Sequence, residues 1–368
     1  MSEGAVCPTC GAAIQAEDAF CESCGATLQA GALPAPVVAS PGAPAPAGDE
    51  TPAAGAAGGT QPTTGAAVGG ASRRCTACGG EVLEDGFCGT CGQRTLSERD
   101  HWSEQPAPWL AGVCDKGIVH ARNEDAMALA ATGDGGLGVL VVCDGVTTAP
   151  DSDRAALVAA RAACAHLLAG GLSSDPDDPE AGVIDRSSTA LIEAAAAANA
   201  AAVGVAHVLG NPAEPPSCTF VAAVVAGDVL TVGWCGDSRA YWLPDVGDGV
   251  QLSIDHSLGT EMIASGIDRA AAEADPMSHT ITRWLGADSL DPRPEVLSRR
   301  LDAPGWVLVC SDGLWNYASA PAELAGLITA TGATDPVVVA DHLVGWANEQ
   351  GGHDNVTAAL ARYAPSLG

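Results

Sequence analysis

The sequence predicts an α+β protein built in layers, with one β-sheet packed on another. Short apolar runs rich in β-branched residues stop at turn residues, which is typical of buried strands; they include GVLVVCDGV (138–146), LTVGWCGDS (230–238) and WVLVCSDGLW (306–315). Alanine-rich stretches between these runs have helical composition and can lie flat on a sheet. Clustered strands with helices between them favour sheet-on-sheet layers.

Two short cysteine clusters precede this part of the chain. Each contains two Cys-x-x-Cys pairs, at Cys7, Cys10, Cys21 and Cys24, and at Cys75, Cys78, Cys88 and Cys91. Four thiolates complete a closed tetrahedral Zn²⁺ site, so residues 1–28 and 73–95 resemble two structural zinc ribbons. Segments of about 25 residues bury too little core to fold without the metal. The alternative is a redox dithiol, which would place one Cys-x-x-Cys within a βαβ unit.

Residues 29–72, between the ribbons, contain 14 Ala, 9 Gly and 7 Pro, and only two charged residues. This composition cannot form a packed core, so we expect a disordered tether. The sequence leaves open whether the two ribbons pair with each other or act separately.

From about residue 102 the composition becomes globular, and we expect one domain over residues 102–365. Strands are expected around 111–113, from 138, at 219–225 and 229–235 as a hairpin, from 306, and at 355–361. Helices are expected from 152 or 153 to 170, from 187 or 188 to 210, at 321–329, and from the Asp335-Pro336 cap to 351. A variable polar stretch follows the predicted hairpin and extends to Pro276.

The charge of the chain argues against a nucleic-acid groove and against anionic membranes. The formal net charge is −29, and residues 102–368 carry 34 acidic and 12 basic residues. Residues 1–28 contain no Lys or Arg, so the first ribbon has no basic face for a phosphate backbone. We therefore expect no nucleic-acid partner and no membrane partner.

Cysteine usage and the N-terminal sequence favour a soluble, cytoplasmic protein. The opening MSEGAVCPTC has no apolar core of the kind found in signal peptides, and residues 190–209 are too weakly apolar for a membrane span. Eight of the 14 cysteines lie in Cys-x-x-Cys pairs, which in the cytosol indicates metal rather than disulfides. A secreted disulfide protein is the alternative.

Acidic residues stand at the ends of the predicted core strands. Asp144, Asp237 and Asp312 each follow an apolar run, and Asp354 leads into the last one. Because an unpaired buried charge is costly, carboxylates at such positions are more often gathered around cations. We therefore expect these four aspartates to share a site for hard divalent ions.

Six short motifs occur in a fixed order along the globular part: NED (123–125), DG (144–145), GDSR (236–239), DHSL (255–258), SDGL (311–314) and DNVT (354–357). In this order they resemble the protein phosphatase 2C family, the metal-dependent Ser/Thr phosphatases also called PPM phosphatases, of the bacterial type. The resemblance covers residues 109–363. It implies a four-layer αββα sandwich, in which helices flank two packed antiparallel sheets.

The resemblance also implies two Mn²⁺ or Mg²⁺ ions in a cleft at one sheet edge, and a third, weaker ion. A hydroxide bridging the two ions would attack phosphorus in line, without a phosphoenzyme. Asp144 would bridge both ions, Asp312 and Asp354 would complete one, and Asp237 with Asp312 would hold the third. The other strong ion would be held by the Gly145 carbonyl with Glu124 or Asp125; these two acids could otherwise be ordinary surface residues.

The sequence departs from the family pattern at two positions. His120 stands where members usually carry a phosphate-binding Arg, and an Arg occurs at position 122 instead. Imidazole is a poorer phosphate clamp than a bidentate guanidinium. Val146 follows the DG motif and cannot donate a proton to the leaving group. With these positions included, the expected catalytic residues are Asp144, Asp312, Asp354, His120 and Arg122.

Several other polar residues are expected to be structural. We expect Asp255 to be a cap or turn residue and His256 to be a local hydrogen-bond anchor. We expect Arg239 to pair with a nearby acid. Six further cysteines lie mostly in apolar runs and read as small core residues: Cys114, Cys143, Cys164, Cys218, Cys235 and Cys310.

The expected function is a phosphatase for phosphoserine and phosphothreonine in proteins, with the ribbons as recruitment modules. Ser/Thr kinases or their substrates are the expected partners, and the chain is expected to be a monomer. Substrate choice is expected to lie in the polar stretch 243–277 and in partner docking. The alternative is a weakly active or inactive phosphatase-fold scaffold that binds phosphoproteins or kinases, which His120 and the altered loop after Gly145 would favour.

Overall fold

The computed structural model describes residues 5–6, 13–14, 89–91, 99–133, 135–172, 180–268, 271–272 and 275–365. The chain divides into two compact units, residues 1–69 and 70–368. In the first unit, β1 (Ala5–Val6) pairs antiparallel with β2 (Ala13–Ile14). The expected tether lies outside the described residues, and so do all the predicted zinc ligands except Cys91, which is exposed in a turn.

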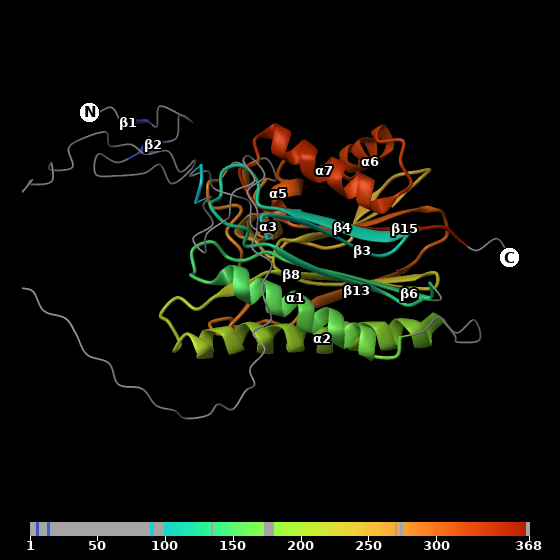
Figure 1. The fold of residues 1–368 in the computed structure, drawn as a ribbon, viewed down its shortest axis with the longest axis horizontal. Coiled ribbons are helices and arrows are strands. Elements are labelled where there is room, and N and C mark those ends of the chain that lie inside the picture. Colours follow the sequence, from blue (N-terminus) through green and yellow to red (C-terminus); the bar gives the residue numbers. More distant parts are fainter. Residues whose placement is uncertain are drawn as a thin grey trace, which may run out of the picture. The chain divides into compact units, whose positions relative to one another are not determined.

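Two antiparallel sheets form the centre of the second unit (Figure 1). The first sheet has the order β11 (Val250–Gln251), β10 (Arg239–Pro244), β14 (Gly305–Cys310), β15 (Val356–Tyr363), β4 (Leu110–Asp115), β3 (His101–Ala107). The second sheet has the order β13 (Glu295–Arg300), β9 (Val229–Cys235), β8 (Phe220–Ala226), β6 (Leu137–Cys143), β5 (Ala126–Ala131). A short separate pair joins β12 (Leu285–Gly286) to β7 (Ser217–Cys218).

Helices cover the outer face of each sheet. The long helices α1 (Ser152–Ala169) and α2 (Glu180–Val208) pack on the second sheet, while α6 (Pro321–Ala330) and α7 (Pro336–Gln350) pack on the first (Figure 1). The described residues also include the short helices α3 (Leu258–Ala264), which lies between β11 and β12 in the chain, and α5 (Asp312–Trp315), which follows the end of β14. The four-layer αββα sandwich predicted from the sequence is therefore confirmed.

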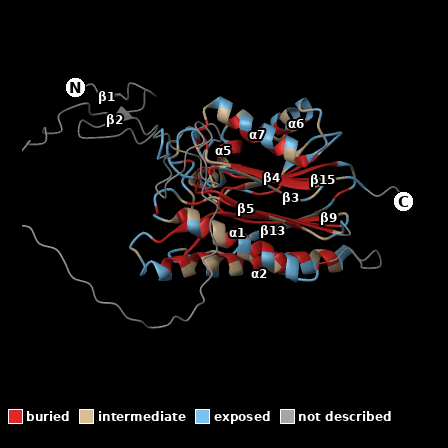
Figure 2. Ribbon diagram, in the orientation of Figure 1, coloured by how far each residue is buried: buried red, intermediate tan, exposed pale blue. Residues whose placement is uncertain are grey.

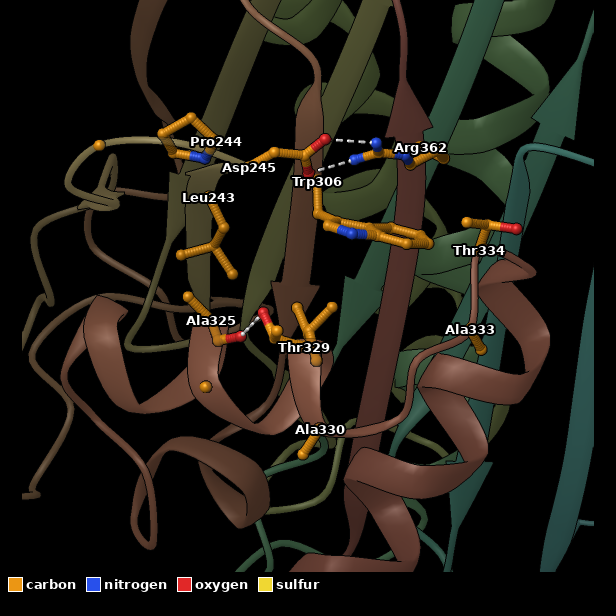
Figure 3. A pocket seen from close by; sticks show the side chains of 13 residues that line it. Leu243, Pro244, Asp245, Trp306, Ala325, Thr329, Ala330, Ala333, Thr334 and Arg362 are labelled. Atoms are coloured by element: carbon orange, nitrogen blue, oxygen red, sulfur yellow. Dashed lines mark hydrogen bonds and ion pairs between the residues drawn. The ribbon is translucent and has the colours of Figure 1, made fainter.

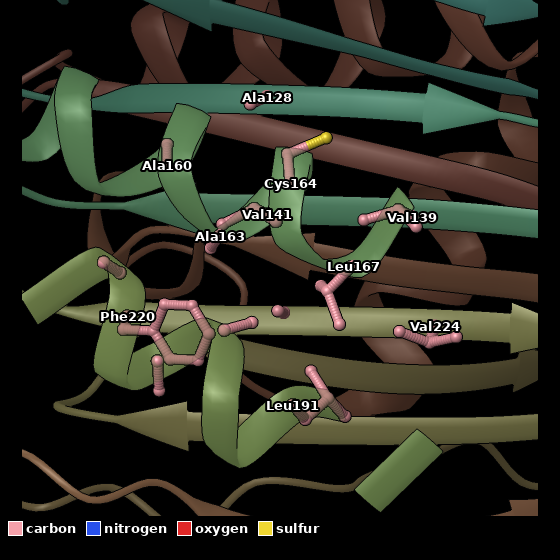
Figure 4. Packing of buried hydrophobic residues seen from close by; sticks show 14 of the residues in the cluster. Ala128, Val139, Val141, Ala160, Ala163, Cys164, Leu167, Leu191, Phe220 and Val224 are labelled. Carbon is pink, nitrogen blue, oxygen red and sulfur yellow. The ribbon is translucent and has the colours of Figure 1, made fainter. Parts of the chain in front are cut away.

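Three apolar layers hold the sandwich together, and both sheets are buried on their two faces (Figure 2). This is why β6, β8, β9 and β14 read as continuous apolar runs rather than as alternating strands. Between α1, α2 and the second sheet, Leu167 and Leu191 pack against Phe220 and Val224 (Figure 4). Each fully buried side chain of this size contributes about 1.5–3 kcal/mol.

One helix among the described residues, α2, is long and apolar enough to cross a membrane by length and composition alone. In the fold it packs against α1 and β9, and Leu191, Ala194 and Ala195 are buried there. One face of this helix therefore contributes to the core of the fold.

Most predicted elements are present, with three kinds of correction. The second long helix begins at Glu180 and not at Ser187 or Ser188, because Ser187 is buried within the helix and does not cap it. The stretch taken as polar up to Pro276 contains β10, β11 and α3. The sequence also gave no signal for β3, β5 and β13, which are edge strands; β13 alternates exposed and half-buried residues, and β5 is mostly alanine.

Candidate metal centre

Strand direction and register bring the predicted aspartates to one edge of the sandwich. In the second sheet, β6 and β9 both run antiparallel to β8, so Asp144 and Asp237 follow strand ends at the same edge. In the first sheet, β15 runs antiparallel to β14 and pairs Ala358 with Cys310. The start of β15 therefore lies beside the end of β14, which places Asp354 near Asp312. The prediction that these residues share one site agrees with this topology.

Asp125 joins these four aspartates, and we call the five residues the carboxylate cluster. Asp144 lies within hydrogen-bonding reach of both Asp125 and Asp312. Burial raises the pKa of Asp125 to about 6 and that of Asp237 to about 7. Burial, together with the neighbouring carboxylates, raises the pKa values of Asp144 and Asp312 well above their usual range. The cluster is therefore a concentration of negative charge that the apo protein accommodates poorly.

The donor chemistry of the cluster fits hard divalent cations. The Oδ1 atoms of Asp125 and Asp312 are buried and have no hydrogen-bond partner, so each presents a lone-pair-bearing oxygen without a proton donor. Carboxylate oxygens are the ligands that Mg²⁺ and Mn²⁺ prefer, and these ions keep several waters. Within the described residues, no three His, Cys, Asp or Glu side chains form a ready ligand group. Bound ions would accordingly need water in part of their coordination shells.

Hydroxyl groups at the strand ends orient Asp125. Its Oδ2 atom accepts hydrogen bonds from Ser311 Oγ at 2.7 Å and from Thr357 Oγ1 at 2.6 Å. Ser311 Oγ also accepts a bond from the Thr357 N–H, so β14, β15 and Asp125 are tied together. One carboxylate oxygen is thereby fixed, and the other is left for a cation.

Thr219 connects the two aspartates of the second sheet. Its Oγ1 atom accepts a hydrogen bond from the Asp144 N–H at 3.0 Å, and its own N–H donates to the Asp144 carbonyl at 2.8 Å. The same hydroxyl lies 2.7 Å from Ser238 Oγ, next to Asp237 in the chain. Thr219 therefore holds the backbone of Asp144 in register with the loop that carries Asp237.

Asn355 fixes the loop that carries Glu124. Its Oδ1 atom accepts a hydrogen bond from the Glu124 N–H at 2.7 Å, and its Nδ2 atom donates to the carbonyls of Lys116 at 2.7 Å and Arg122 at 3.1 Å. Gly145 lies close against this loop, because a Cβ added at Gly145 would stand 2.7 Å from the Glu124 carbonyl oxygen. The absent side chain allows the two predicted metal-binding segments to touch.

The structure separates the two acids that the sequence left as alternatives. The Glu124 carboxylate accepts bonds from Arg122 Nε at 3.0 Å and Nη2 at 2.6 Å. Asp125, in contrast, belongs to the carboxylate cluster. The Glu124 side chain is thus occupied by an ion pair, while Asp125 is in position to bind a cation.

His120 and Arg122 lie at the edge of the site in different settings. His120 Nε2 stands 3.4 Å from Asp354 Oδ1, so the imidazole faces the cluster. The Arg122 side chain is 51% exposed, although it pairs with Glu124. His120 is therefore next to a predicted ligand, and Arg122 presents a half-exposed guanidinium beside it in the same loop.

The structure gives structural partners to Arg239 and His256, as the sequence predicted. Arg239 forms a two-pronged ion pair with Asp255, at 2.9 Å from Nε and 2.6 Å from Nη2, and its guanidinium lies over the Trp315 ring at 3.6 Å. His256 Nδ1 accepts a hydrogen bond from the Gly236 N–H at 3.1 Å. The six cysteines between 114 and 310 are all buried, as predicted.

A cavity of about 650 Å³ lies between β10, β14 and α6 (Figure 3). None of its lining residues belongs to the carboxylate cluster. It opens beside Trp306, at the start of β14, whereas Asp312 follows the end of that strand. Arg362 lies near the Trp306 ring and makes two 2.6 Å bonds to Asp245. The charged groups of this cavity are thus paired with each other.

Three positioning residues had no assigned role from sequence: Thr219, Ser311 and Thr357. Ser311 and Thr357 lie within the SDGL and DNVT motifs, so the motifs were the available signal. Thr219 lies in no motif, and its contacts to Asp144 and Ser238 depend on the pairing of distant strands.

Comparison with known proteins agrees with this architecture. The sequence matches the protein phosphatase 2C family over residues 118–346 and the double zinc ribbon family over residues 7–92. It is 28% identical to the serine/threonine protein phosphatase PstP of Mycobacterium tuberculosis over 252 residues. These aligned residues make up 68% of this chain and 44% of PstP. It is also 34% identical to the protein phosphatase PhpP of Streptococcus pneumoniae over 114 residues. These aligned residues make up 30% of this chain and 44% of PhpP. The chain therefore spans less than half the length of these curated relatives.

Solved structures of bacterial phosphatases share the fold of about 70% of this chain. The Mycobacterium tuberculosis phosphatase PstP/Ppp superposes with a TM-score of 0.54 at 26% identity, covering 69% of this chain and 97% of that one. The Staphylococcus aureus phosphatase Stp1 superposes with a TM-score of 0.57 at 23% identity, covering 73% and 96%. The catalytic domain of PstP in complex with two manganese ions superposes with a TM-score of 0.50 at 24% identity, covering 69% and 98%.

Proposed function

The chain belongs to the protein phosphatase 2C family, and on that premise we propose that it hydrolyses phosphoserine and phosphothreonine in proteins, using divalent metal ions. The carboxylate cluster is the observation that carries the proposal. Five aspartates lie near enough to one another at one edge of the sandwich for neighbouring carboxylates to raise the pKa values of Asp144 and Asp312, and the buried Oδ1 atoms of Asp125 and Asp312 have no hydrogen-bond partner. Such a group has no structural use without cations, because buried like charges destabilise a fold.

Two Mn²⁺ or Mg²⁺ ions, when bound, would lower the pKa of a water molecule and neutralise charge on the phosphoryl oxygens. Asp144, Asp312 and Asp354, together with Asp125 and the Gly145 carbonyl, would hold these two ions. Asp237 with Asp312 would hold a weaker third ion. The catalytic domain of PstP, which shares this fold, has been solved in complex with two manganese ions, and this supports a proposal of two ions.

The cysteine environments support direct hydrolysis over a covalent cysteine intermediate. Burial raises the pKa of the Cys164 thiol to about 11 and that of Cys235 to about 12, and it raises the pKa values of Cys143 and Cys310 as well. A thiol attacks phosphorus as the thiolate, so a high pKa makes these residues poor nucleophiles. These four thiols are therefore disfavoured as nucleophiles, and we propose that water activated at the cluster attacks phosphorus.

His120 and Arg122 are proposed to receive the substrate phosphate. His120 faces Asp354, and the guanidinium of Arg122 is half exposed in the same loop. Asn355 holds this loop against β15 through three hydrogen bonds, so both side chains start from a fixed backbone. An arginine already paired with Glu124 would bind phosphate through its outward-facing N–H groups.

The double zinc ribbon segment is proposed to bind two structural Zn²⁺ ions and to recruit partner proteins. The match over residues 7–92 supports the zinc assignment. The absence of Lys and Arg from residues 1–28 favours protein contacts over nucleic acid. Ser/Thr kinases or their substrates are the proposed partners of a cytoplasmic, monomeric enzyme.

A second candidate function is a phosphatase-fold scaffold with little activity. It is favoured by His120, which replaces a bidentate cation with an imidazole, and by Val146 and Thr147 in the loop after Gly145. This candidate and the enzyme differ in turnover and not in fold, so kinetics separate them.

The test is Mn²⁺-dependent hydrolysis of p-nitrophenyl phosphate and of a phosphothreonine peptide by the full chain. Asp144→Asn should lower kcat by at least about 10³-fold, since it removes the residue shared by both ions. Asp341→Asn is the matched control, because the Asp341 side chain is 70% exposed on α7, where its Oδ1 atom lies 4.0 Å from His101 Nε2. A parent protein that binds Mn²⁺ without turning over either substrate would support the scaffold instead.

A further inference from the structure

Arg99 lies in the chain between the last predicted zinc ligand, Cys91, and strand β3. The double zinc ribbon match ends at residue 92 and the phosphatase match begins at residue 118, so neither match includes Arg99. Its half-buried side chain nevertheless reaches the loop of residues 123–125. Arg99 is therefore in contact with the backbone of Asp125, a residue of the carboxylate cluster.

One nitrogen atom of Arg99 holds this loop at two points. Its Nη2 atom donates hydrogen bonds to the Asp125 carbonyl at 2.8 Å and to the Asn123 carbonyl at 3.2 Å. In return, Asn123 Nδ2 donates to the Arg99 carbonyl at 3.0 Å. Because the bonds run in both directions, neither segment can shift without breaking bonds that the other makes.

Asp125 is thereby held at its backbone as well as at its side chain. Its N–H donates to Asn123 Oδ1 at 3.1 Å, and its carbonyl accepts from Arg99. Its Oδ2 atom accepts from Ser311 and Thr357, which leaves the buried Oδ1 atom without a hydrogen-bond partner. A ligand group that is already ordered loses little entropy when an ion binds, so these contacts favour binding through Oδ1.

Arg99 can support the loop because the segment that follows it is fixed to both sheets. The carbonyl of the next residue, Asp100, accepts from the Lys116 N–H at 2.8 Å, and β3 then pairs with β4 in the first sheet. On β3, Glu104 Oε2 accepts from the Leu129 N–H at 2.9 Å. Leu129 belongs to β5, so this bond ties the edge strands of the two sheets together.

We propose that Arg99 is a positioning residue for the metal centre, which holds the Asp125 backbone so that Oδ1 stays in place for a divalent ion. The inference rests on the proposed function, which assigns Asp125 to the metal ions. Arg99 acts through backbone carbonyls, so the property that depends on it is metal affinity. Loss of a residue that orients a metal ligand typically lowers affinity about 10–100-fold.

The experiment measures Mn²⁺ binding to the full chain by isothermal titration calorimetry. Arg99→Met keeps most of the aliphatic stem and removes both hydrogen bonds, so the dissociation constant for Mn²⁺ should rise about 10–100-fold. Arg99→Lys tests rescue, because one Nζ atom can donate to both carbonyls as the one Nη2 atom does. Its dissociation constant should stay within about threefold of the parent value.

Arg362→Met is the matched control. Arg99 and Arg362 are both half-buried, and each guanidinium lies 5.1 Å from the centroid of a tryptophan ring, Trp102 and Trp306 respectively. Arg362 also donates two side-chain hydrogen bonds, but their acceptor is Asp245, which is outside the carboxylate cluster. Both methionine variants should lose stability in urea titrations, whereas only Arg99→Met should bind Mn²⁺ more weakly.

Kinetics with p-nitrophenyl phosphate separate metal positioning from damage to the substrate site. The Mn²⁺ concentration for half-maximal turnover should rise in Arg99→Met by the same factor as the dissociation constant. At saturating Mn²⁺, kcat and KM should return to within about threefold of the parent, because the loss lies in metal affinity.

A dissociation constant in Arg99→Met within about twofold of the parent would overturn this inference. It would also be overturned by an equal loss of affinity in Arg362→Met, or by an Arg99→Lys variant as weak as Arg99→Met. If circular dichroism shows that Arg99→Met does not fold, Arg99→Gln takes its place with the same prediction, because the glutamine side chain is too short to reach the two carbonyls.

The two proposals can fail separately. A parent protein that binds Mn²⁺ without turnover would refute the phosphatase function, and the dissociation constants would still decide the role of Arg99. Normal turnover with unchanged Mn²⁺ affinity in Arg99→Met would refute the role of Arg99 and leave the phosphatase function standing. A parent that binds no Mn²⁺ would overturn both.

Discussion

Asn355 anchors the loop that carries the candidate phosphate-binding residues, and its removal should have a measurable cost in stability. Its side chain is 2% exposed and makes three hydrogen bonds to the loop of residues 116–124. Asn355→Ala removes all three, and it leaves the buried N–H of Glu124 and two carbonyls without their partner. The loop that carries the candidate phosphate-binding residues and leads into Asp125 would then lose its anchor to β15.

The expected loss of stability follows from counting these bonds. Each neutral hydrogen bond contributes about 1 kcal/mol net, and an orphaned buried N–H adds to the cost, so the total is about 3 kcal/mol. For a domain of this size, that corresponds to a fall in Tm of roughly 6–12 °C. Asn199→Ala is the control, because the Asn199 side chain accepts a hydrogen bond from the Gly286 N–H on β12 and does not bond to the loop of residues 116–124; about 1 kcal/mol is expected there.

All eight tryptophans lie between residues 102 and 346, so their fluorescence follows the unfolding of the phosphatase domain within the full chain. The Mn²⁺ concentration for half-maximal hydrolysis of p-nitrophenyl phosphate should rise in Asn355→Ala and stay at the parent value in Asn199→Ala. A loss below about 0.5 kcal/mol, or equal effects in the two variants, would refute the anchoring role assigned to Asn355.

Three further predictions concern other parts of the molecule. Arg239→Ala should lower the free energy of unfolding by about 3–5 kcal/mol in urea titrations, because it leaves Asp255 buried without its cation; a loss under 1 kcal/mol would contradict the pairing. Burial lowers the pKa of His256, so the folded state favours the neutral ring and stability should fall as pH drops below about 6.5. His256→Asn should flatten this part of the stability profile between pH 7.5 and 5.5, and an unchanged slope would exclude His256 as its source. Purified full chain should contain two Zn²⁺ per molecule by elemental analysis, and a zinc chelator should release them without lowering Mn²⁺-dependent turnover.

The sequence predicted the layered fold because the central strands are buried on both faces and are therefore apolar along nearly their whole length. The runs at β6, β9 and β14 are apolar on both faces, and Asp335-Pro336 announces α7, where the Asp335 side chain caps the helix by accepting from the Val337 N–H. The edge strands β3 and β13 have no continuous apolar run. The β13 sequence EVLSRR is half exposed, and β3 includes a proline, so neither could be told from a loop.

At the site, the sequence pattern identified the acidic residues but not the residues that orient them. Asp144, Asp237, Asp312 and Asp354 stand out because charge at the end of an apolar strand is unusual. The hydroxyl groups that bind Asp125 and Asp144 are ordinary serines and threonines whose partners lie 75 to 232 residues away. Long-range pairing of that kind is set by strand register, which no local pattern encodes. The choice between Glu124 and Asp125 likewise needed the observed ion pair with Arg122.

The most direct test of the central claim is Mn²⁺-dependent hydrolysis of a phosphothreonine peptide by the full chain, measured beside Asp312→Asn. The Asp312 Oδ1 atom is buried without a hydrogen-bond partner, so an asparagine can occupy the same space while removing a charged ligand. We predict turnover in the parent and a loss of at least about 10³-fold in the variant, with the fold intact by circular dichroism. Equal turnover in both proteins would contradict the claim that the carboxylate cluster is the metal centre. No turnover in either, with Mn²⁺ bound, would show that the fold serves as a binding scaffold.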